Sequence, residues 1–186
     1  MRVILMSELF PYTWDLARAM IFVDGENLAI RYGAMLKERK ESPRSDIVCV
    51  PNILAWSTLL NPRHGTPAVM RKYYYTSVQG DRDKVKEIEE KLKDVGIETP
   101  RVFKKTKDKG SKGVDIALST DMLLHATRKH YDVAVLVAGD EDYVPLVRAV
   151  QGEGARVYVW FISNGLSPAL RMVADCYVNL DDFMFE

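Results

Sequence analysis

The chain has 186 residues, of which 47% are hydrophobic and 28% are charged, so we expect one globular domain with a substantial core. Its 26 basic and 26 acidic side chains balance, which excludes a global basic field and leaves only a local patch for any nucleic-acid partner. Cys49 and Cys176 match no metal or redox spacing, and no apolar run approaches the roughly 18 residues of a membrane span. These features favour a cytoplasmic protein.

Residues 1–18 are interpreted as an irregular or partly helical extension, and residues 19–186 as one domain. Within that domain, apolar runs that end in turn residues alternate with segments of helical spacing. We predict strands at 19–23, 69–78, 97–103, 133–138 and 157–161 with an edge strand at 177–180, and helices at 28–40, 51–60, 82–95, 114–129, 144–150 and 167–174. This alternation predicts an α/β fold, a three-layer sandwich with a mainly parallel central sheet.

The most informative stretch runs from residue 132 to residue 143. Its uninterrupted apolar run, 133–138, is typical of a strand buried on both faces, and it ends in Gly139 followed by Asp140 and Asp142. In parallel sheets, ligands bind at the carboxyl ends of the strands, where these two aspartates fall. Any chemistry is therefore expected at this turn.

Other acidic residues map to the same edge of the predicted sheet. Asp24 directly follows the first strand, and Asp115 begins the helix that follows the third. Each of these two alone is most often a helix cap. Together with Asp140 and Asp142 they would repel one another and raise each other's pKa, unless a divalent cation such as Mg²⁺ or Mn²⁺ bound between them.

Two further polar residues have more than one interpretation. Asp121, six residues into its helix, belongs either to a solvated face or to a supporting carboxylate. Asn27 is either a cap or a group that hydrogen-bonds a catalytic carboxylate or positions phosphate or water.

Three motifs of the chain are Phe22-Val23-Asp24-Gly25-Glu26-Asn27-Leu28, then Lys112-Gly113-Val114-Asp115 with Asp121, and Ala138-Gly139-Asp140-Glu141-Asp142-Tyr143. In this order they resemble the NYN domain family of PIN-like ribonucleases, with the LabA-like branch as the nearest group. The resemblance covers about residues 20–180. It implies a PIN-like parallel sheet and a Mg²⁺ or Mn²⁺ site that hydrolyses RNA phosphodiester bonds. Tyr143 stands where phenylalanine is common in the family.

On this hypothesis, each acidic residue has an expected role. Asp24, Asp115 and Asp140 would bind the metal directly, and Asp142 would complete the site or hold a metal-bound water. Asp121 and Asn27 would support the catalytic group. The metal would orient a water molecule, lower its pKa and neutralise the leaving oxygen.

A glycine-rich loop at residues 104–113 carries five lysines. Such a charge run is usually a solvated loop, but this one leads directly into Asp115, so its cations would border the acidic site. A phosphate backbone needs such cations to approach carboxylates. We therefore expect single-stranded RNA to bind at Lys104, Lys105, Lys107, Lys109 and Lys112.

Two other functions remain open on the sequence. Asp140 and Asp142 satisfy the Asp-x-Asp-x-Val pattern of haloacid dehalogenase-type phosphatases, although that pattern normally follows the first strand and here follows the fourth. A non-catalytic PIN-like module that binds RNA or a protein is the other alternative. A dinucleotide-binding domain is a poor fit because the chain lacks Gly-x-Gly-x-x-Gly.

Overall fold

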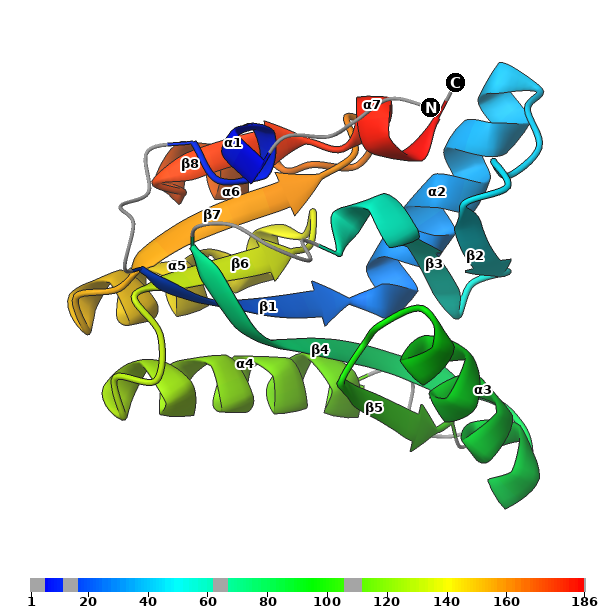
Figure 1. Cartoon of the computed structure of the whole chain (residues 1–186), viewed down its shortest axis with the longest axis horizontal. Coiled ribbons are helices and arrows are strands. Elements are labelled where there is room, and N and C mark those ends of the chain that lie inside the picture. The colour runs from blue at the N-terminus through cyan, green and yellow to red at the C-terminus, as the bar shows by residue number, and fades with distance from the viewer. Residues whose placement is uncertain (1–5, 12–16, 62–66, 106–111, 186) are drawn as a thin grey trace.

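The computed structural model describes residues 6–11, 17–61, 67–105 and 112–185. Its centre is a six-stranded sheet in the order β5-β4-β1-β6-β7-β8, and all neighbouring strands are parallel (Figure 1). The strands are β1 (Arg18–Asp24), β4 (Ala68–Val78), β5 (Thr99–Lys104), β6 (Val133–Val137), β7 (Arg156–Phe161) and β8 (Cys176–Asn179). The predicted parallel sheet is confirmed.

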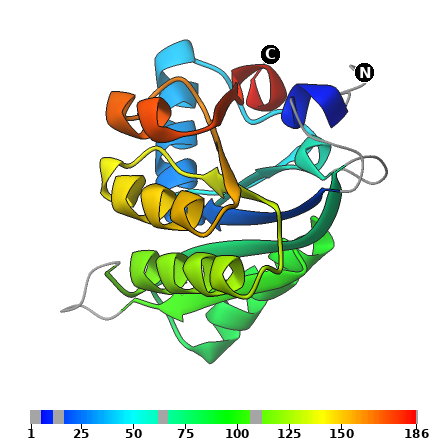
Figure 2. The ribbon, with the colours of Figure 1, turned by 90° about the vertical axis from the view of Figure 1, so that its left-hand side faces the viewer.

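Successive apolar side chains of the central strands point to opposite faces of the sheet. Helices therefore cover both faces. Ile21 and Val23 of β1 pack with α2 (Gly25–Arg39) and α3 (Arg82–Asp94), whereas Phe22 packs on the opposite face. That opposite face carries α4 (Lys112–Thr127), α5 (Val144–Gly152) and α6 (Pro168–Val173). Figure 2 shows α4 and α5 side by side. The result is the predicted three-layer α/β sandwich.

The order of the strands creates a switch point between β1 and β6. From β1 the chain proceeds outward through β4 to β5, and from β6 it proceeds in the other direction through β7 to β8. The connections that leave the carboxyl ends of β1 and β6 therefore diverge, although these two strands are hydrogen-bonded neighbours. A crevice at such a point is the usual ligand site of an open parallel sheet.

The helix predicted at residues 51–60 is wrong. The structure has an antiparallel hairpin of β2 (Ile47–Val50) and β3 (Leu54–Ser57), and a short 3₁₀-helix, η1 (Thr58–Leu60), follows it. Asn52 reverses the chain with a left-handed φ of 60°. The backbone N–H of Ala55 donates to the buried hydroxyl of Tyr74 at 3.1 Å, which fixes β3 against the core. The apolar residues of this segment thus serve strand packing.

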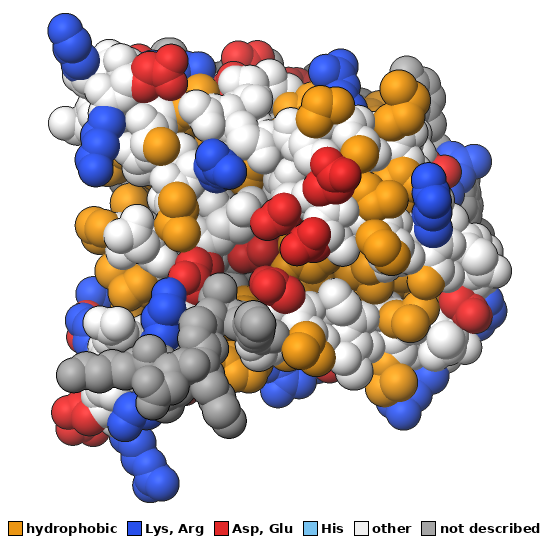
Figure 3. Space-filling view, turned by 180° about the vertical axis from the view of Figure 1, so that it is seen from behind, with side chains coloured by type: hydrophobic (Ala, Val, Ile, Leu, Met, Phe, Trp, Pro, Cys, Tyr) orange, Lys and Arg blue, Asp and Glu red, His pale blue; other side chains and the backbone are white. Residues whose placement is uncertain are grey.

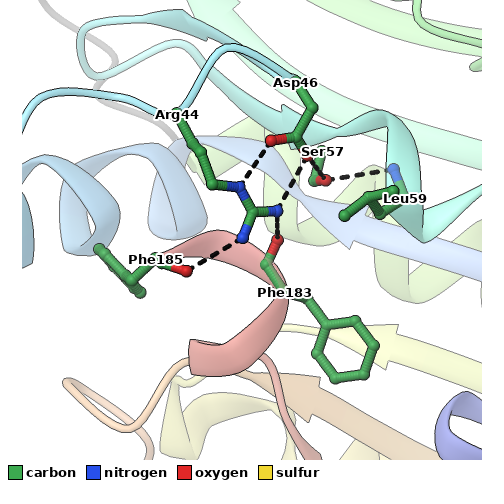
Figure 4. A network of polar contacts seen from close by, with 6 residues as sticks. All are labelled: Arg44, Asp46, Ser57, Leu59, Phe183 and Phe185. Atoms are coloured by element: carbon green, nitrogen blue, oxygen red, sulfur yellow. Dashed lines mark hydrogen bonds and ion pairs between the residues drawn. The ribbon is translucent and has the colours of Figure 1, made fainter. Parts of the chain in front are cut away.

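Arg44 joins this hairpin to the C-terminal helix α7 (Asp181–Met184) (Figure 4). Its guanidinium donates to both carboxylate oxygens of Asp46, at 2.6 and 2.9 Å. It also donates to the carbonyl oxygens of Phe183 and Phe185, at 2.7 and 3.0 Å. Ser57 donates to Asp46 at 2.6 Å, so the network connects the hairpin with the end of the described chain.

The first described segment, which contains α1 (Met6–Leu9), packs on the same side of the sheet as α2. Leu9 and Phe10 are buried, and the ring of Phe10 lies edge-on to that of Trp160 with centroids 5.2 Å apart. Of the helices that the structure describes, none is long and apolar enough to cross a membrane.

Candidate active site

Asp24 is the last residue of β1 and caps the helix that follows. Its Oδ1 accepts a hydrogen bond from the backbone N–H of Asn27 at 3.0 Å, and its side chain is buried. Glycine is required at the next position, because a Cβ on Gly25 would lie 1.9 Å from Cε1 of Tyr74. The tight packing of this turn fixes where the Asp24 carboxylate lies.

Asn27 connects this turn with the one that follows β6. The side-chain oxygen of Asn27 accepts a hydrogen bond from the backbone N–H of Gly139 at 3.1 Å. Gly139 has no room for a side chain either, since a Cβ there would lie 2.4 Å from the carbonyl oxygen of Gly165. Asn27 therefore acts on the backbone here, and it holds the two diverging turns of the switch point together.

Tyr143 brings the acidic residues of distant segments together. It ends the 3₁₀-helix η2 (Glu141–Tyr143), and its buried hydroxyl oxygen lies 2.9 Å from Oδ2 of Asp24 and 3.3 Å from Oδ1 of Asp115. The single hydroxyl proton is donated to one of these carboxylates at a time, and Asp24 is the nearer. Since both carboxylate oxygens contact one phenolic oxygen, they lie within about 6 Å of each other. Asp24 and Asp115 thus share one site.

The electrostatics of this site disfavour negative charge. Burial raises the pKa of Asp24 to about 6, despite the hydrogen bonds from Asn27 and Tyr143 that lower it. The pKa of Asp115 is also raised, first by loss of solvent around its carboxyl group and then by the nearby charges. The charges that act on Asp115 come from Asp140, Glu26 and Asp142.

These residues form an acidic cluster, which we define as Asp24, Glu26, Asp115, Asp140 and Asp142. Figure 3 shows acidic side chains gathered in one group on a face of the molecule. Asp140 and Asp142 are exposed, and Asp140 makes no side-chain cap hydrogen bond although it occupies the N-cap position of η2. Its carboxylate is therefore available to a ligand.

Glu26 belongs to this cluster although it is not among the site residues predicted from the sequence. One of its carboxylate oxygens accepts from Ser77 at 2.7 Å, and the other pairs with the ammonium group of Lys105 at 2.6 Å. Glu26 lies between Asp24 and Asn27 in the sequence, so the acidic turn after β1 was the available signal. Its partners lie 51 and 79 residues away and could not be read from that turn.

Asp121 has partners of its own, away from the Tyr143 hydroxyl. It accepts a hydrogen bond from the hydroxyl of Tyr75 at 2.9 Å and lies 3.6 Å from the guanidinium of Arg101. It lines a hollow of about 400 Å³ between β5 and α4, together with Arg101 and Phe103. Its proposed support of the acidic cluster stays a prediction.

The predicted substrate-binding lysines are described only in part. Lys104 ends β5 at an exposed position, and Lys105 follows it and pairs with Glu26. Lys107 and Lys109 lie outside the described residues, and Lys112 is described only as the first backbone position of α4. One lysine of the five thus has a described contact with the acidic cluster.

The chemistry of the cluster suits a hard divalent cation, because carboxylate oxygens are its preferred ligands and their mutual repulsion would be relieved. As the side chains lie, however, no three His, Cys, Asp or Glu residues in the described part of the chain are close enough together to hold a metal ion. The Tyr143 hydroxyl instead lies against both Asp24 and Asp115. The chemistry of the donor set fits such an ion, although the side-chain positions of the described residues do not form its coordination shell.

Comparisons with known proteins identify the family and the fold of the chain. Residues 18–181 match the model of the NYN domain. A search of curated proteins gave no significant match. Among solved structures, the chain is similar to a protein of unknown function from Vibrio parahaemolyticus, with a TM-score of 0.66 and 21% identity over 94% of this chain and 99% of that one. At this identity the similarity shows the fold alone.

Proposed function

The chain belongs to the NYN domain family of PIN-like nucleases, and from this premise we propose that it hydrolyses phosphodiester bonds in single-stranded RNA with Mg²⁺ or Mn²⁺. The observation that carries the proposal is the contact of one hydroxyl, that of Tyr143, with both Asp24 and Asp115. A carboxylate at the end of β1 and one in the first turn of α4 thereby lie close together. The motif residues also favour the LabA-like branch of the family.

In this proposal, Asp24, Asp115 and Asp140 bind the cation, and Asp142 completes the site or binds water. A bound divalent cation would supply a more acidic water and neutralise charge on the leaving oxygen. Asp24 is the most fixed of these groups, since its carboxylate is buried and hydrogen-bonded through both oxygens. The exposed Asp140 and Asp142 lie on the open side, from which substrate would approach.

Other residues of the chain would orient the substrate and the ligands. Asn27 keeps the turns after β1 and β6 in register through its bond to Gly139. Lys105 places a cation beside the acidic cluster, where an RNA phosphate must pass carboxylates that repel it. We propose that the five lysines of the segment 104–113 neutralise the phosphate backbone and make no base-specific contacts. They are Lys104, Lys105, Lys107, Lys109 and Lys112.

An end-labelled single-stranded RNA incubated with the full chain tests this function. Cleavage is expected with Mg²⁺ or Mn²⁺ and none in EDTA, and the variant Asp115→Asn should lose it. Asp83→Asn, which changes an exposed acid in the first turn of α3, is the matched control and should remain active. Cleavage in EDTA, or full activity of Asp115→Asn, would contradict the proposal.

The same preparation separates nuclease from phosphatase chemistry. A haloacid dehalogenase-type phosphatase forms a covalent aspartyl-phosphate, whereas the proposed hydrolysis has no covalent intermediate. We expect no phosphate to be trapped on Asp140 when a labelled phosphomonoester is incubated with the protein and the reaction is quenched in acid. Trapped label at that residue would favour the phosphatase.

A further inference from the structure

The hydroxyl of Tyr143 contacts two carboxylates of the acidic cluster, whereas that of Tyr131 in the same core bonds to the backbone. The ring of Tyr143 packs in the core between the sheet and the helices α4 and α5, and the residue is 3% exposed. The hydroxyl emerges from this core at the acidic cluster and contacts Asp24 and Asp115. The apolar packing therefore fixes the position of the polar group.

The two carboxylates that it contacts come from segments that are otherwise separate. Asp24 ends β1, and Asp115 lies in the first turn of α4, on the opposite face of the sheet from α2. Tyr143 lies 119 residues from the first and 28 from the second along the chain. Its hydroxyl is thus a physical link between two proposed metal ligands that would otherwise repel each other.

A hydroxyl in this position restricts the orientation of whichever of the two carboxylates accepts its single proton, and it lies in contact with the other. A carboxylate oxygen has two acceptor sites, so an oxygen that accepts from Tyr143 keeps a second site for a cation. Groups that hydrogen-bond to metal-binding carboxylates hold them in the binding orientation, and their removal typically lowers metal affinity by about 10–100-fold. Phenylalanine would preserve the packing and delete only this link.

We propose that Tyr143 is a positioning residue that presents Asp24 and Asp115 to a divalent cation, an inference that rests on the proposed metal site. The hydroxyl does not contact the reacting atoms. Because folding already holds the two carboxylates close together, less free energy is spent on bringing them together when the cation binds. Cation affinity, more than the fold, should depend on it.

The test compares Mn²⁺ binding to the wild-type chain, Tyr143→Phe and Tyr131→Phe by titration calorimetry. Tyr131 is the matched control, because its buried hydroxyl lies in the same core and donates to the carbonyl oxygen of Met122 at 2.7 Å. We expect Tyr143→Phe to bind Mn²⁺ at least about 10-fold more weakly and Tyr131→Phe to bind it like the wild type. Melting curves in EDTA report whether each variant folds cooperatively.

The outcomes separate this inference from the proposed function. Mn²⁺ binding by the wild type with unchanged or tighter binding by Tyr143→Phe would overturn the positioning role and leave the nuclease proposal intact. Equal weakening in Tyr131→Phe would also overturn it, since removal of any buried hydroxyl would then suffice. A wild-type chain that binds no Mn²⁺ would overturn both.

A double-mutant cycle keeps the inference testable if Tyr143→Phe melts at a lower temperature. The hydroxyl is proposed to act through Asp115 as well as Asp24, so its removal should weaken Mn²⁺ binding less when Asp115→Asn is already present. Additive effects of Tyr143→Phe and Asp115→Asn on the binding free energy would show that the hydroxyl does not act through that carboxylate, and would overturn this part of the proposal.

Discussion

The ammonium group of Lys105 lies 2.6 Å from Oε1 of Glu26, so a cation from the segment after β5 contacts the acidic cluster at the end of β1. Both side chains are partly shielded, with 32% and 13% of their areas exposed. The same ammonium group can neutralise Glu26 in the free protein and a phosphate in the complex. The pair therefore places Lys105, one of the five lysines of the segment 104–113 (here called the lysine loop), beside the site.

The lysine loop should bind RNA through backbone phosphates. Replacing Lys104, Lys105, Lys107 and Lys109 together by alanine is expected to weaken binding of single-stranded RNA at low salt. The slope of log affinity against log salt should flatten by roughly 0.7 for each phosphate that the variant no longer neutralises. Fluorescence anisotropy at several salt concentrations, in the presence of EDTA to prevent cleavage, measures both effects.

Lys86→Ala is the control for this experiment, because Lys86 is an exposed lysine on α3 that lies 3.9 Å from Glu90. It removes one positive charge from a helix surface and should leave the salt slope unchanged. An unchanged slope in the four-lysine variant would show that the loop is merely solvated.

Asp24 should make the metal-free protein more stable as the pH falls toward 4. Its pKa is raised from 3.8 to about 6 in the folded state, so the folded protein binds a proton more tightly than the unfolded chain. The penalty for its ionised form is fully present above pH 6 and is removed as the pH falls through 6 toward 3.8. About two pKa units correspond to about 2–3 kcal/mol.

Urea unfolding in EDTA at about pH 7.5 and about pH 5 checks this effect, because these values lie on either side of the raised pKa. Asp24→Asn carries no charge at either pH and still caps α2, so its stability should gain less between the two pH values than that of the wild type. Equal gains in both proteins would mean that the Asp24 carboxyl group titrates at its ordinary pKa.

Most of the fold could be predicted from the sequence, because each central strand is an apolar run that ends in a turn residue. The segment 47–60 could not, since Ile53, Trp56 and Leu60 have helical spacing. The choice between a helix and a hairpin depends on tertiary structure, because β3 lies against the hydroxyl of Tyr74 and Asn52 turns the chain. Local spacing contains neither fact.

The part of the candidate site that depends only on sheet topology could be predicted from the sequence. Asp24 and Asp115 follow the carboxyl ends of strands, and that rule alone brings them to one edge of the sheet. The bond from Tyr143 to Asp24 and the pairing of Glu26 with Lys105 depend on side-chain directions between distant segments. Sequence spacing says nothing about those directions.

Arg44 should stabilise the protein through the C-terminal helix. Arg44→Met keeps an aliphatic side chain but leaves Asp46 and the carbonyl oxygens of Phe183 and Phe185 without this donor. We expect a loss of about 2 kcal/mol in the free energy of urea unfolding, since hydrogen bonds to charged groups are among the stronger ones. Arg82→Met, at an exposed position on α3, should change it little; an equal loss would contradict a specific role for the network.

Asp140→Asn distinguishes a metal ligand from a structural residue. Asparagine has nearly the same shape but no charge, and Asp140 makes no cap hydrogen bond that the change could remove. If its carboxylate binds the cation, divalent-dependent cleavage of single-stranded RNA should fall by about 100-fold or more, because several kcal/mol of charge stabilisation depend on the site. Melting in EDTA should show equal or slightly higher stability, since one charge that repels Asp115 is gone.

The matched control for this variant is Asp81→Asn. Asp81 caps α3 by accepting from the backbone N–H of Lys84 at 3.0 Å, and asparagine caps about as well. Asp81→Asn should therefore leave both cleavage and melting unchanged. The two aspartates differ in that only Asp140 belongs to the acidic cluster, so a loss of cleavage confined to Asp140→Asn would follow from the charge at that site. Full activity in Asp140→Asn would rule out its role as a metal ligand.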